Sequence, residues 1–487
     1  MRTTTTSFCS LLLLVSFACS TKPNEQIVKN DVSAAATPNI VYILADDLGY
    51  GDLGFTGQAY IKTPNLDKLA ETGMFFTDHY SGSTVCAPSR STLVSGLHTG
   101  HAPVRGNYEI QPEGQYPLPD SVFTLFESLK AAGYTTGAFG KWGLGYPGSE
   151  GDPNKQGVDV FYGYNCQRMG HNYYPYHLWH NQDSVVLEEN AGTNLGVYAP
   201  DLIHEQTLKF IEDYQDRPFF LYVPSIIPHA ELIAPEEEMA KHLGRFEETP
   251  YKGVDEGPTY KIGGYMSQEN PRAAFVAMVE LLDQQVGEIL DKLEDLGLRE
   301  NTLVVFTSDN GPHLEGGADP EFFDSNGPYR GHKRDLYEGG IRVPMIANWP
   351  GKIAPGLSDH PSAFWDMFAT IGDLTGAKVP DNTDGISFAP TLLGKKKAQA
   401  QHPYLYWEFI EQGGKQAIRK GDWKAIRVNL NADPNPPIEL YNLAEDPGEQ
   451  MNLATRYPER VAAFKALMES SHRPNPVFKL YAQELEN

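Results

Sequence analysis

The chain has 487 residues, of which 40% are hydrophobic and 21% are charged, and this composition is typical of a globular protein that buries a sizeable core. The length suggests two or three domains. The formal net charge of −24 argues against nucleic acid and against an anionic membrane surface as partners, so an anionic substrate would have to be held by positive charge gathered locally.

The first 19 residues have the pattern of an export signal, which predicts an exported protein of the periplasm or the outer membrane. Arg2 gives a positive start, and residues 11–18 form an apolar stretch that is too short to span a bilayer. Cys19 follows directly, as in bacterial lipoproteins, so lipidation of Cys19 and simple cleavage nearby are both compatible with the segment. Residues 20–36 are polar or small and are expected to form a tether.

The chain then alternates apolar runs with helical patterns. Residues 39–45 are apolar and rich in β-branched side chains, which predicts a strand buried on both faces. Further strands are expected at 135–139, 219–223, 303–307 and 343–348, and helices at 120–132 and 275–293. This alternation predicts an α/β fold in which helices cover both faces of a parallel sheet.

The sequence pattern changes towards the C-terminus. Short apolar runs separated by turn residues predict an antiparallel sheet, with strands at 404–409, 416–419, 423–428 and 438–442. Residues 456–470 are expected to form a closing helix. The interpretation is a main domain at 37–390 and a smaller C-terminal subdomain at 391–487.

Chemically active side chains follow four of the predicted strands. In chain order they are Asp46 and Asp47, Lys141, His229, and Asp309 and Asn310. Open α/β sheets bind ligands outside the carboxyl ends of their strands, so these side chains are expected to meet at one edge. The acids and the amide offer only oxygen donors, which favours calcium or magnesium over zinc; the alternative for each pair is an ordinary turn.

The most specific segment begins at a cysteine. Cys86-Ala-Pro88-Ser-Arg90 resembles the motif that formylglycine-generating enzymes recognise in type I sulfatases. Other blocks resemble the same family in the same order. They are 46–49, 63–70, 140–142, 228–229, 308–311, Lys333 with 337–344, 440–443 and 446–449. A formylglycine at position 86 leaves Cys166 as a free, buried thiol.

The resemblance implies an alkaline-phosphatase-like fold with a mixed, mostly parallel sheet. It also implies an enzyme that hydrolyses sulfate esters. Cys86 is expected to be oxidised to formylglycine by a maturase, and calcium to be bound by Asp46, Asp47, Asp309, Asn310 and the group made from Cys86. By the same resemblance, Arg90 holds the formylglycine hydrate, Lys141 and Lys333 offset the charge of sulfate, and His229 protonates the leaving oxygen.

One position departs from the family pattern. The family usually has a histidine after Gly-Lys-Trp, where this chain has Gly143, and that histidine normally contacts the hydrate. Either another group serves, such as His313 or a histidine of residues 171–180, or the enzyme is slower, or the protein binds without turnover.

The substrate is expected to be a sulfated glycan. Residues 167–179 combine aromatics, histidines and an arginine, which is compatible with a loop packed on the body or with a sugar-binding loop. On the second interpretation, the candidate contacts are Arg168, His171, Tyr173, His177 and His313. Galactose or N-acetylgalactosamine sulfates are the first expectation. The alternatives are a phosphonate or phosphodiester hydrolase of the same superfamily and a non-catalytic protein that binds sulfated glycans.

Overall fold

The computed structural model describes residues 1–7, 37–482 and 484. Most of the expected export signal, with Cys19 and the tether, lies outside the described residues. The described residues from 37 onwards form one compact unit, which also contains the C-terminal sheet. Within the described ranges, none of the helices combines the length and the apolar character that crossing a membrane would require.

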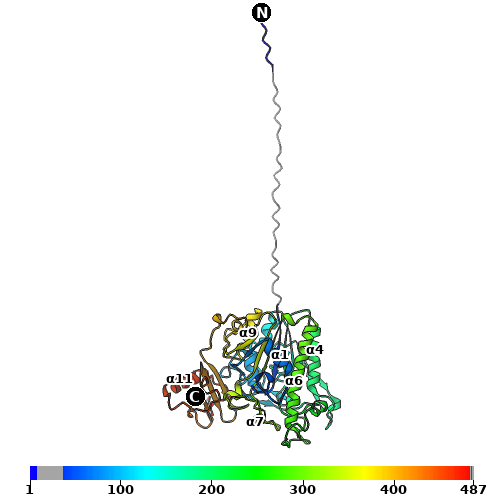
Figure 1. Ribbon diagram of the computed structural model, residues 1–487, viewed down its shortest axis with the longest axis vertical. Coiled ribbons are helices and arrows are strands. Elements are labelled where there is room, and N and C mark those ends of the chain that lie inside the picture. Colours follow the sequence, from blue (N-terminus) through cyan, green and yellow to red (C-terminus); the bar gives the residue numbers. More distant parts are fainter. Residues whose placement is uncertain (8–36, 483, 485–487) are drawn as a thin grey trace. The chain divides into compact units, whose positions relative to one another are not determined.

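A ten-stranded mixed sheet forms the centre of this unit (Figure 1). Its middle is parallel, in the order β11 (Thr302–Ser308), β1 (Asn39–Ala45), β10 (Phe219–Pro224), β6 (Thr135–Lys141) and β7 (Val160–Tyr164). Next to β11 lie β12 (Met345–Asn348), β2 (Met74–Phe76) and β13 (Gly356–Ser358), and next to β7 lie β8 (His177–His180) and β9 (Asp183–Val186). The predicted strands are therefore present, with β12 antiparallel to β11.

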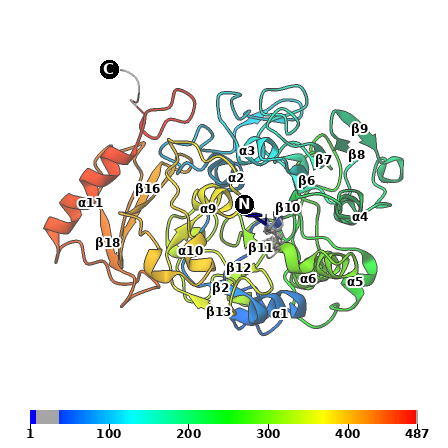
Figure 2. The same cartoon turned by 90° about the horizontal axis from the view of Figure 1, so that it is seen from above.

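The central strands are apolar on both sides because helices cover both faces (Figure 2). Val41 and Ile43 of β1 pack with α1 (Pro64–Thr72), α4 (Ala199–Asp213) and α6 (Pro271–Asp295). Ile40, Tyr42 and Leu44 point the other way, into the core shared with α2 (Cys86–Ser95), α3 (Leu125–Ala131), α9 (Asp366–Thr375) and α10 (Ala389–Leu392). The alternation along one strand thus divides the core into two layers.

Two sequence expectations need correction. The helix expected at 120–132 begins only at Leu125, because Thr124 caps it: the Thr124 hydroxyl accepts from the Glu127 N–H at 3.1 Å and the Glu127 carboxylate accepts from the Thr124 N–H at 2.8 Å. The segment 167–179, interpreted as a loop, instead ends in β8, which pairs with β7 and β9 at the sheet edge.

A second, antiparallel sheet follows near the C-terminus. Its strands are β15 (Leu405–Phe409), β16 (Lys415–Lys420), β17 (Trp423–Val428) and β18 (Glu439–Asn442), in that order. One face packs on α11 (Pro458–Ser471) through Phe464 and Met468. The other face places Trp407 against Tyr80 and Trp365 of the main body.

The remaining elements are short. They are α5 (Glu236–Ala240), α7 (Pro320–Phe323), α8 (Glu338–Ile341), and two small sheets that pair β3 (His79–Tyr80) with β14 (Ser362–Ala363) and β4 (Glu109–Ile110) with β5 (Gly114–Gln115).

Candidate active site

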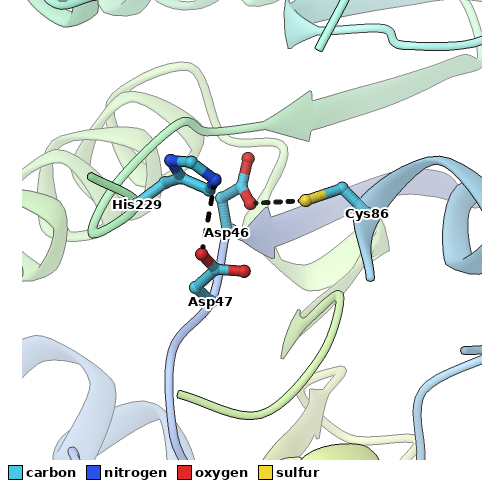
Figure 3. Close-up of side chains that lie close together, drawn as sticks. All are labelled: Asp46, Asp47, Cys86 and His229. Atoms are coloured by element: carbon cyan, nitrogen blue, oxygen red, sulfur yellow. Dashed lines mark hydrogen bonds and ion pairs between the residues drawn. The ribbon is translucent and has the colours of Figure 1, made fainter. Parts of the chain in front are cut away.

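The carboxyl ends of β11, β1, β10 and β6 bring the expected side chains together, and Figure 3 shows Asp46, Asp47 and His229 beside Cys86. Asp46 and Asp47 follow β1, Lys141 closes β6, His229 lies beyond β10, and Asp309 and Asn310 follow β11. All six are buried. Their convergence follows from strand order alone, since parallel strands end at the same edge.

Cys86 reaches this edge from the first turn of α2, a helix buried along its whole length. Its thiol donates to Asp46 Oδ1 at 3.1 Å, and Lys141 Nζ lies 3.6 Å from Sγ. Arg90 is one helical turn further on and therefore lies on the same face of α2. The N-terminus of a helix favours negative charge, so α2 adds its own positive end to the site.

Three carboxylates and three cations balance one another here. Lys141 Nζ donates to Asp46 Oδ2 and Lys333 Nζ to Asp47 Oδ2, each at 2.7 Å. Arg90 Nη2 bridges Asp309 Oδ2 at 2.9 Å and Asp46 Oδ2 at 3.1 Å.

The pKa values reflect this network. Burial raises the pKa of Asp46, but Lys141 and Arg90 outweigh it, so the net pKa lies well below the usual value. Burial, with the neighbouring Asp46 charge, raises the pKa of Asp309 to about 6.

Cys86 is held as a neutral thiol. Burial, followed by the negative charges of Asp309 and Asp46, raises its pKa well above the ordinary value. A thiol is a weak nucleophile until it loses its proton, so the unmodified side chain is poorly suited to attack a substrate.

The donor set fits a hard divalent cation. Ligand atoms of Asp46, Asp47, Cys86 and His229 all lie within 4.8 Å of one another. Asn310 Nδ2 donates to Asp47 Oδ1 at 2.6 Å, while Asn310 Oδ1 is buried with no hydrogen-bond partner among the described residues and could coordinate a cation. Carboxylate and amide oxygens are the ligands that calcium prefers. A divalent cation would also turn a balanced site into a positive one, as an anionic substrate requires.

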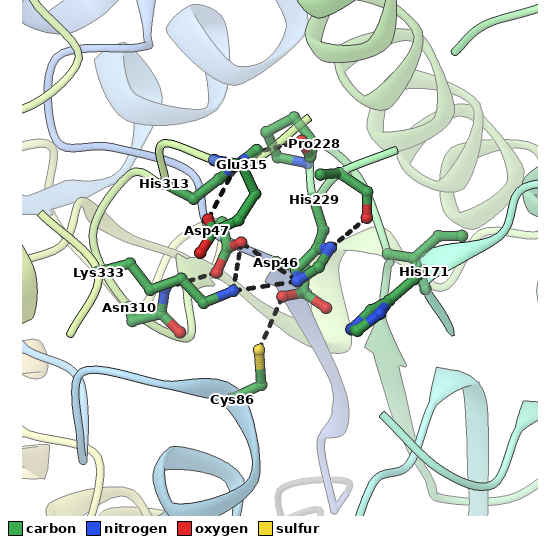
Figure 4. A network of polar contacts seen from close by, with 12 residues as sticks. Asp46, Asp47, Cys86, His171, Pro228, His229, Asn310, His313, Glu315 and Lys333 are labelled. Carbon is green, nitrogen blue, oxygen red and sulfur yellow. Dashed lines mark hydrogen bonds and ion pairs between the residues drawn. The ribbon is translucent and has the colours of Figure 1, made fainter. Parts of the chain in front are cut away.

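Three imidazoles stack above this cluster (Figure 4). The ring of His229 lies between His171, at 4.7 Å between centroids and 9° between planes, and His313, at 5.7 Å and 20°. Each ring donates to a main-chain carbonyl: His171 Nδ1 to Gly263, His229 Nδ1 to Ala230 and His313 Nε2 to Pro228. These contacts fix which nitrogen of each neutral ring carries the proton.

The pKa values of the three histidines are shifted in different directions. Burial, then Lys333 and Lys141, lower the pKa of His229 well below its ordinary value. Burial, then Lys141 and Lys333, lower the pKa of His171 to about 3. Burial also lowers the pKa of His313, but Glu315 and Asp47 outweigh it and the net pKa is raised.

Two expected substrate contacts need correction. The Tyr173 side chain is fully buried, and its hydroxyl donates to the carbonyls of Ile226 and His229 at 2.7 and 2.8 Å, so it holds the His229 loop instead of facing a ligand. His313 is buried too, and its second nitrogen accepts from the Glu315 N–H at 3.2 Å, so it supports His229 from behind.

Besides His171 of the histidine stack, two expected contacts lie further out. Arg168 is half-buried, and donates to the Ile262 carbonyl at 2.9 Å and to Gln111 Oε1 at 3.1 Å. His177 pairs with Glu113 at 2.8 Å, and Trp179 Nε1 donates to the same carboxylate at 2.9 Å. Substrate binding by Arg168 and His177 stays a prediction.

The structure gives a steric reason for the glycine at position 143. Its φ is 73°, and a β-carbon there would lie 1.7 Å from Gln167 Nε2. The Gln167 amide thus occupies the space in which a histidine side chain at this position would begin.

Sequence reasoning missed Tyr265 and Glu315. Tyr265 packs against both His171 and His229, and Glu315 lies 3.4 Å from His313. Both come from loops without periodic pattern, so no local signal in the sequence points to them.

Comparisons with known proteins agree with this geometry. A model of the sulfatase family matches residues 38–377, and a model of the C-terminal region of N-sulphoglucosamine sulphohydrolase matches residues 329–471. The chain is 35% identical to arylsulfatase A of Homo sapiens, over 90% of this chain and 88% of that protein. It is 29% identical to N-acetylgalactosamine-6-O-sulfatase of Bacteroides thetaiotaomicron, over 94% of this chain and 98% of that protein.

Among solved structures, Ps i-CgsB in complex with k-i-k-neocarrahexaose matches with a TM-score of 0.75 and 29% identity, over 91% of this chain and 95% of that chain. This likeness confirms the expected alkaline-phosphatase-like fold. The chain therefore belongs to the sulfatase family and is a sulfuric ester hydrolase.

Proposed function

We propose that the chain removes sulfate from sulfated glycans, with galactose or N-acetylgalactosamine sulfates as the expected substrates. The observation that carries this proposal is the position of Cys86: its side chain lies between Asp46 Oδ1 at 3.1 Å and Lys141 Nζ at 3.6 Å, at the positive end of α2. A nucleophile placed there faces two lysines and an arginine that can balance an anionic group against the overall charge of −24.

The proposed nucleophile is a formylglycine made from Cys86 by a maturase. Its hydrate supplies two hydroxyls on one carbon, one to attack sulfur and one whose deprotonation expels sulfate. The motif Cys86-Ala-Pro88-Ser-Arg90 and the membership of the chain in the sulfatase family support this proposal.

The proposed metal is calcium, held by Asp46, Asp47, Asp309 and Asn310 with the group at position 86. Bound there, it would supply Lewis-acid activation of an oxygen and positive charge against the sulfate. The unpartnered Asn310 Oδ1 supports this assignment.

The chain's own cations would orient and neutralise the sulfate. Lys141 is bonded to Asp46 and Lys333 to Asp47, so both lysines lie at the site. Arg90, bonded to Asp309 and Asp46, fixes those carboxylates beneath the nucleophile. Preorganised charge of this kind is often the largest single contribution to catalysis.

His229 would deliver a proton to the leaving oxygen from Nε2. Its Nδ1 already donates to the Ala230 carbonyl, so only Nε2 can exchange a proton. Lys333 Nζ donates to that nitrogen at 3.0 Å, so a charged proton donor lies beside the proposed acid. A sugar alkoxide is a poor leaving group, so this protonation matters.

A sugar substrate fits the surroundings. Arg168 and Gln111 offer polar groups, and Glu113 joins His177 to the partly exposed Trp179. Aromatic faces beside hydrogen-bonding groups are typical of sugar-binding sites. The names of relatives support the same class, because one is an N-acetylgalactosamine-6-O-sulfatase and another, Ps i-CgsB, was solved in complex with k-i-k-neocarrahexaose.

The test is turnover of a panel, using protein produced with a formylglycine-generating enzyme. Defined sulfated galactose and N-acetylgalactosamine derivatives should release sulfate, whereas a bis-aryl phosphate and an aryl phosphonate should react far more slowly. Faster reaction of the phosphorus esters would favour the phosphodiesterase alternative. Tight binding of sulfated sugars without turnover of any substrate would favour the non-catalytic alternative.

Export is part of the proposal and rests on residues 1–19 alone. Labelled palmitate should be incorporated into the wild-type chain and not into Cys19→Ala if Cys19 is lipidated. A cleaved, unlabelled periplasmic form would favour simple signal cleavage.

A further inference from the structure

We infer that His171 is the catalytic residue that takes the proton from the group at position 86 when sulfate is expelled. This inference rests on the proposed function, because the step exists only if a hydrate forms from Cys86. It assigns a role that Gly143, without a side chain, cannot perform.

The placement of His171 carries the first part of the argument. Its ring stacks on His229 at 4.7 Å, and the adjacent Gly170 packs so closely on Lys141 that a β-carbon on it would lie 2.9 Å from Lys141 Cδ. Lys141 Nζ is in turn 3.6 Å from Cys86 Sγ. His171 thus lies beside both Lys141 and His229. Figure 4 shows the nitrogen-bearing end of the His171 ring on the side of Asp46 and Cys86.

The hydrogen bonds carry the second part. Both ring nitrogens of His229 are engaged, by the Ala230 carbonyl and Lys333. Both nitrogens of His313 are engaged, by the Pro228 carbonyl and the Glu315 N–H. In His171 only Nδ1 has a partner among the described residues, the Gly263 carbonyl at 3.3 Å.

That contact also sets the tautomer. A carbonyl can only accept, so Nδ1 carries the proton and Nε2 presents a lone pair. Of the three stacked imidazoles, His171 is therefore the one with a free basic nitrogen within the described part of the chain.

The step balances as follows. The O–H bond of the remaining hydroxyl breaks and its proton goes to His171 Nε2. The electron pair left behind forms the C=O bond of the aldehyde, and sulfate leaves with the electrons of the C–O bond. His171 then returns the proton to solvent.

The experiment compares His171→Asn with the wild-type enzyme and with His180→Ala, an exposed histidine of the same segment. Asparagine keeps a donor near the position of Nδ1, facing the Gly263 carbonyl, and removes the basic nitrogen. With nitrophenyl sulfate, whose leaving group needs no proton, His171→Asn should lower kcat by about 10²–10⁴-fold and should release a rapid burst of about one nitrophenol per active site. The fold-loss on a sugar sulfate should be similar or smaller, and His180→Ala should behave as wild type.

A second measurement does not depend on turnover. In protein that retains Cys86 as cysteine, the affinity for a sulfated galactoside, measured by calorimetry, should change less than about threefold between wild type and His171→Asn. If this variant melts markedly earlier than wild type, His171→Gln takes its place in both measurements.

A loss of activity without a burst, a loss confined to sugar sulfates, or a rise in KM with unchanged kcat would each overturn the assignment. If the wild-type enzyme turns over no sulfate ester at all, the proposed function fails and the inference falls with it. Sulfatase activity close to the wild-type level in His171→Asn would overturn the inference and leave the proposed function standing.

Discussion

Lys333 Nζ donates a hydrogen bond to His229 Nε2 across 3.0 Å. The lysine is also bonded to Asp47 at 2.7 Å, so it remains charged, and Asp47 raises its pKa although burial opposes this. On the proposed function, the imidazole is neutral at rest, and Lys333 is the charged group beside the nitrogen that would protonate the leaving oxygen. His229 and Lys333 are therefore treated together as the proposed acid.

This pairing predicts a dependence on the leaving group. His229→Ala should lower kcat/KM for a sugar sulfate by about 10²–10⁴-fold and for nitrophenyl sulfate by much less, because a nitrophenolate leaves without a proton. Lys333→Ala should harm both substrates, since it also removes charge beside the sulfate. Equal losses on both substrates in His229→Ala would assign that histidine to sulfate binding instead.

The nucleophile can be tested by mass. Protein made with a formylglycine-generating enzyme should yield a peptide about 18 Da lighter at position 86 than the cysteine form. Cys86→Ser should not shift and should be inactive. Fully active enzyme with an unmodified thiol would exclude the aldehyde.

Metal removal should affect both turnover and stability. A chelator should abolish turnover and lower the melting temperature, and calcium should restore both, because a ligand that binds only the folded state stabilises it by mass action. Asp309→Ala should abolish calcium binding. The exposed Asp216 lies outside the site, so Asp216→Ala should change neither property. Unchanged metal content in Asp309→Ala would move the site elsewhere.

A buried acid beside the site predicts a pH effect on stability. Burial raises the pKa of Glu231 to about 7, although it accepts hydrogen bonds from the Met266 and Tyr173 N–H groups. The folded protein therefore keeps this proton at pH values where the unfolded chain has lost it. Its effect on stability is absent below about pH 4.5 and grows as a cost between about pH 4.5 and 7.

Glu231→Gln removes this titration. The free energy of unfolding should then fall less steeply across that window than in wild type, by up to about 3 kcal/mol in total. Urea unfolding at several pH values measures the slope. Parallel curves for the two proteins would show that Glu231 does not titrate there.

How far the site could be predicted from the sequence depends on which structural element carries each residue. The cluster of Asp46, Lys141, His229 and Asp309 follows from strand ends in a parallel sheet, which apolar runs reveal. Cys86 and Arg90 were expected together from their motif, and in the structure they share a face of α2 because they are four positions apart. These features are local or topological, so the sequence alone was enough to expect them.

The histidine stack was not predictable in the same way. It depends on three segments outside the main helices and strands, around His171, His229 and His313. Two of the ring hydrogen bonds join residues more than 80 positions apart: His171 Nδ1 to the Gly263 carbonyl and His313 Nε2 to the Pro228 carbonyl. Tyr173 shows the same limit: its aromatic ring suggested a sugar contact, but its hydroxyl is used to fix a loop. The residue types in a segment indicate which chemistry is possible, whereas the direction in which each side chain points is set by tertiary packing.

Gly143 allows a test of why this chain lacks the usual histidine. Gly143→Ala should lower stability for two reasons: its φ of 73° is strained for any residue with a β-carbon, at about 1–2 kcal/mol, and that carbon would meet Gln167 Nε2. Gly148→Ala is the matched control, because φ there is 83° and nothing lies within 4 Å of the added carbon, so only the strain remains. Gly143→Ala should therefore melt earlier than Gly148→Ala.

Adding Gln167→Ala should relieve only the contact. In a double-mutant cycle, Gly143→Ala and Gln167→Ala should show a favourable coupling free energy of about 0.5–3 kcal/mol, whereas Gly148→Ala and Gln167→Ala should be additive. Thermal and urea unfolding measure both. Equal costs for the two glycine variants, with no coupling to Gln167, would mean that Gln167 moves aside freely. Steric exclusion would then not explain the glycine at position 143.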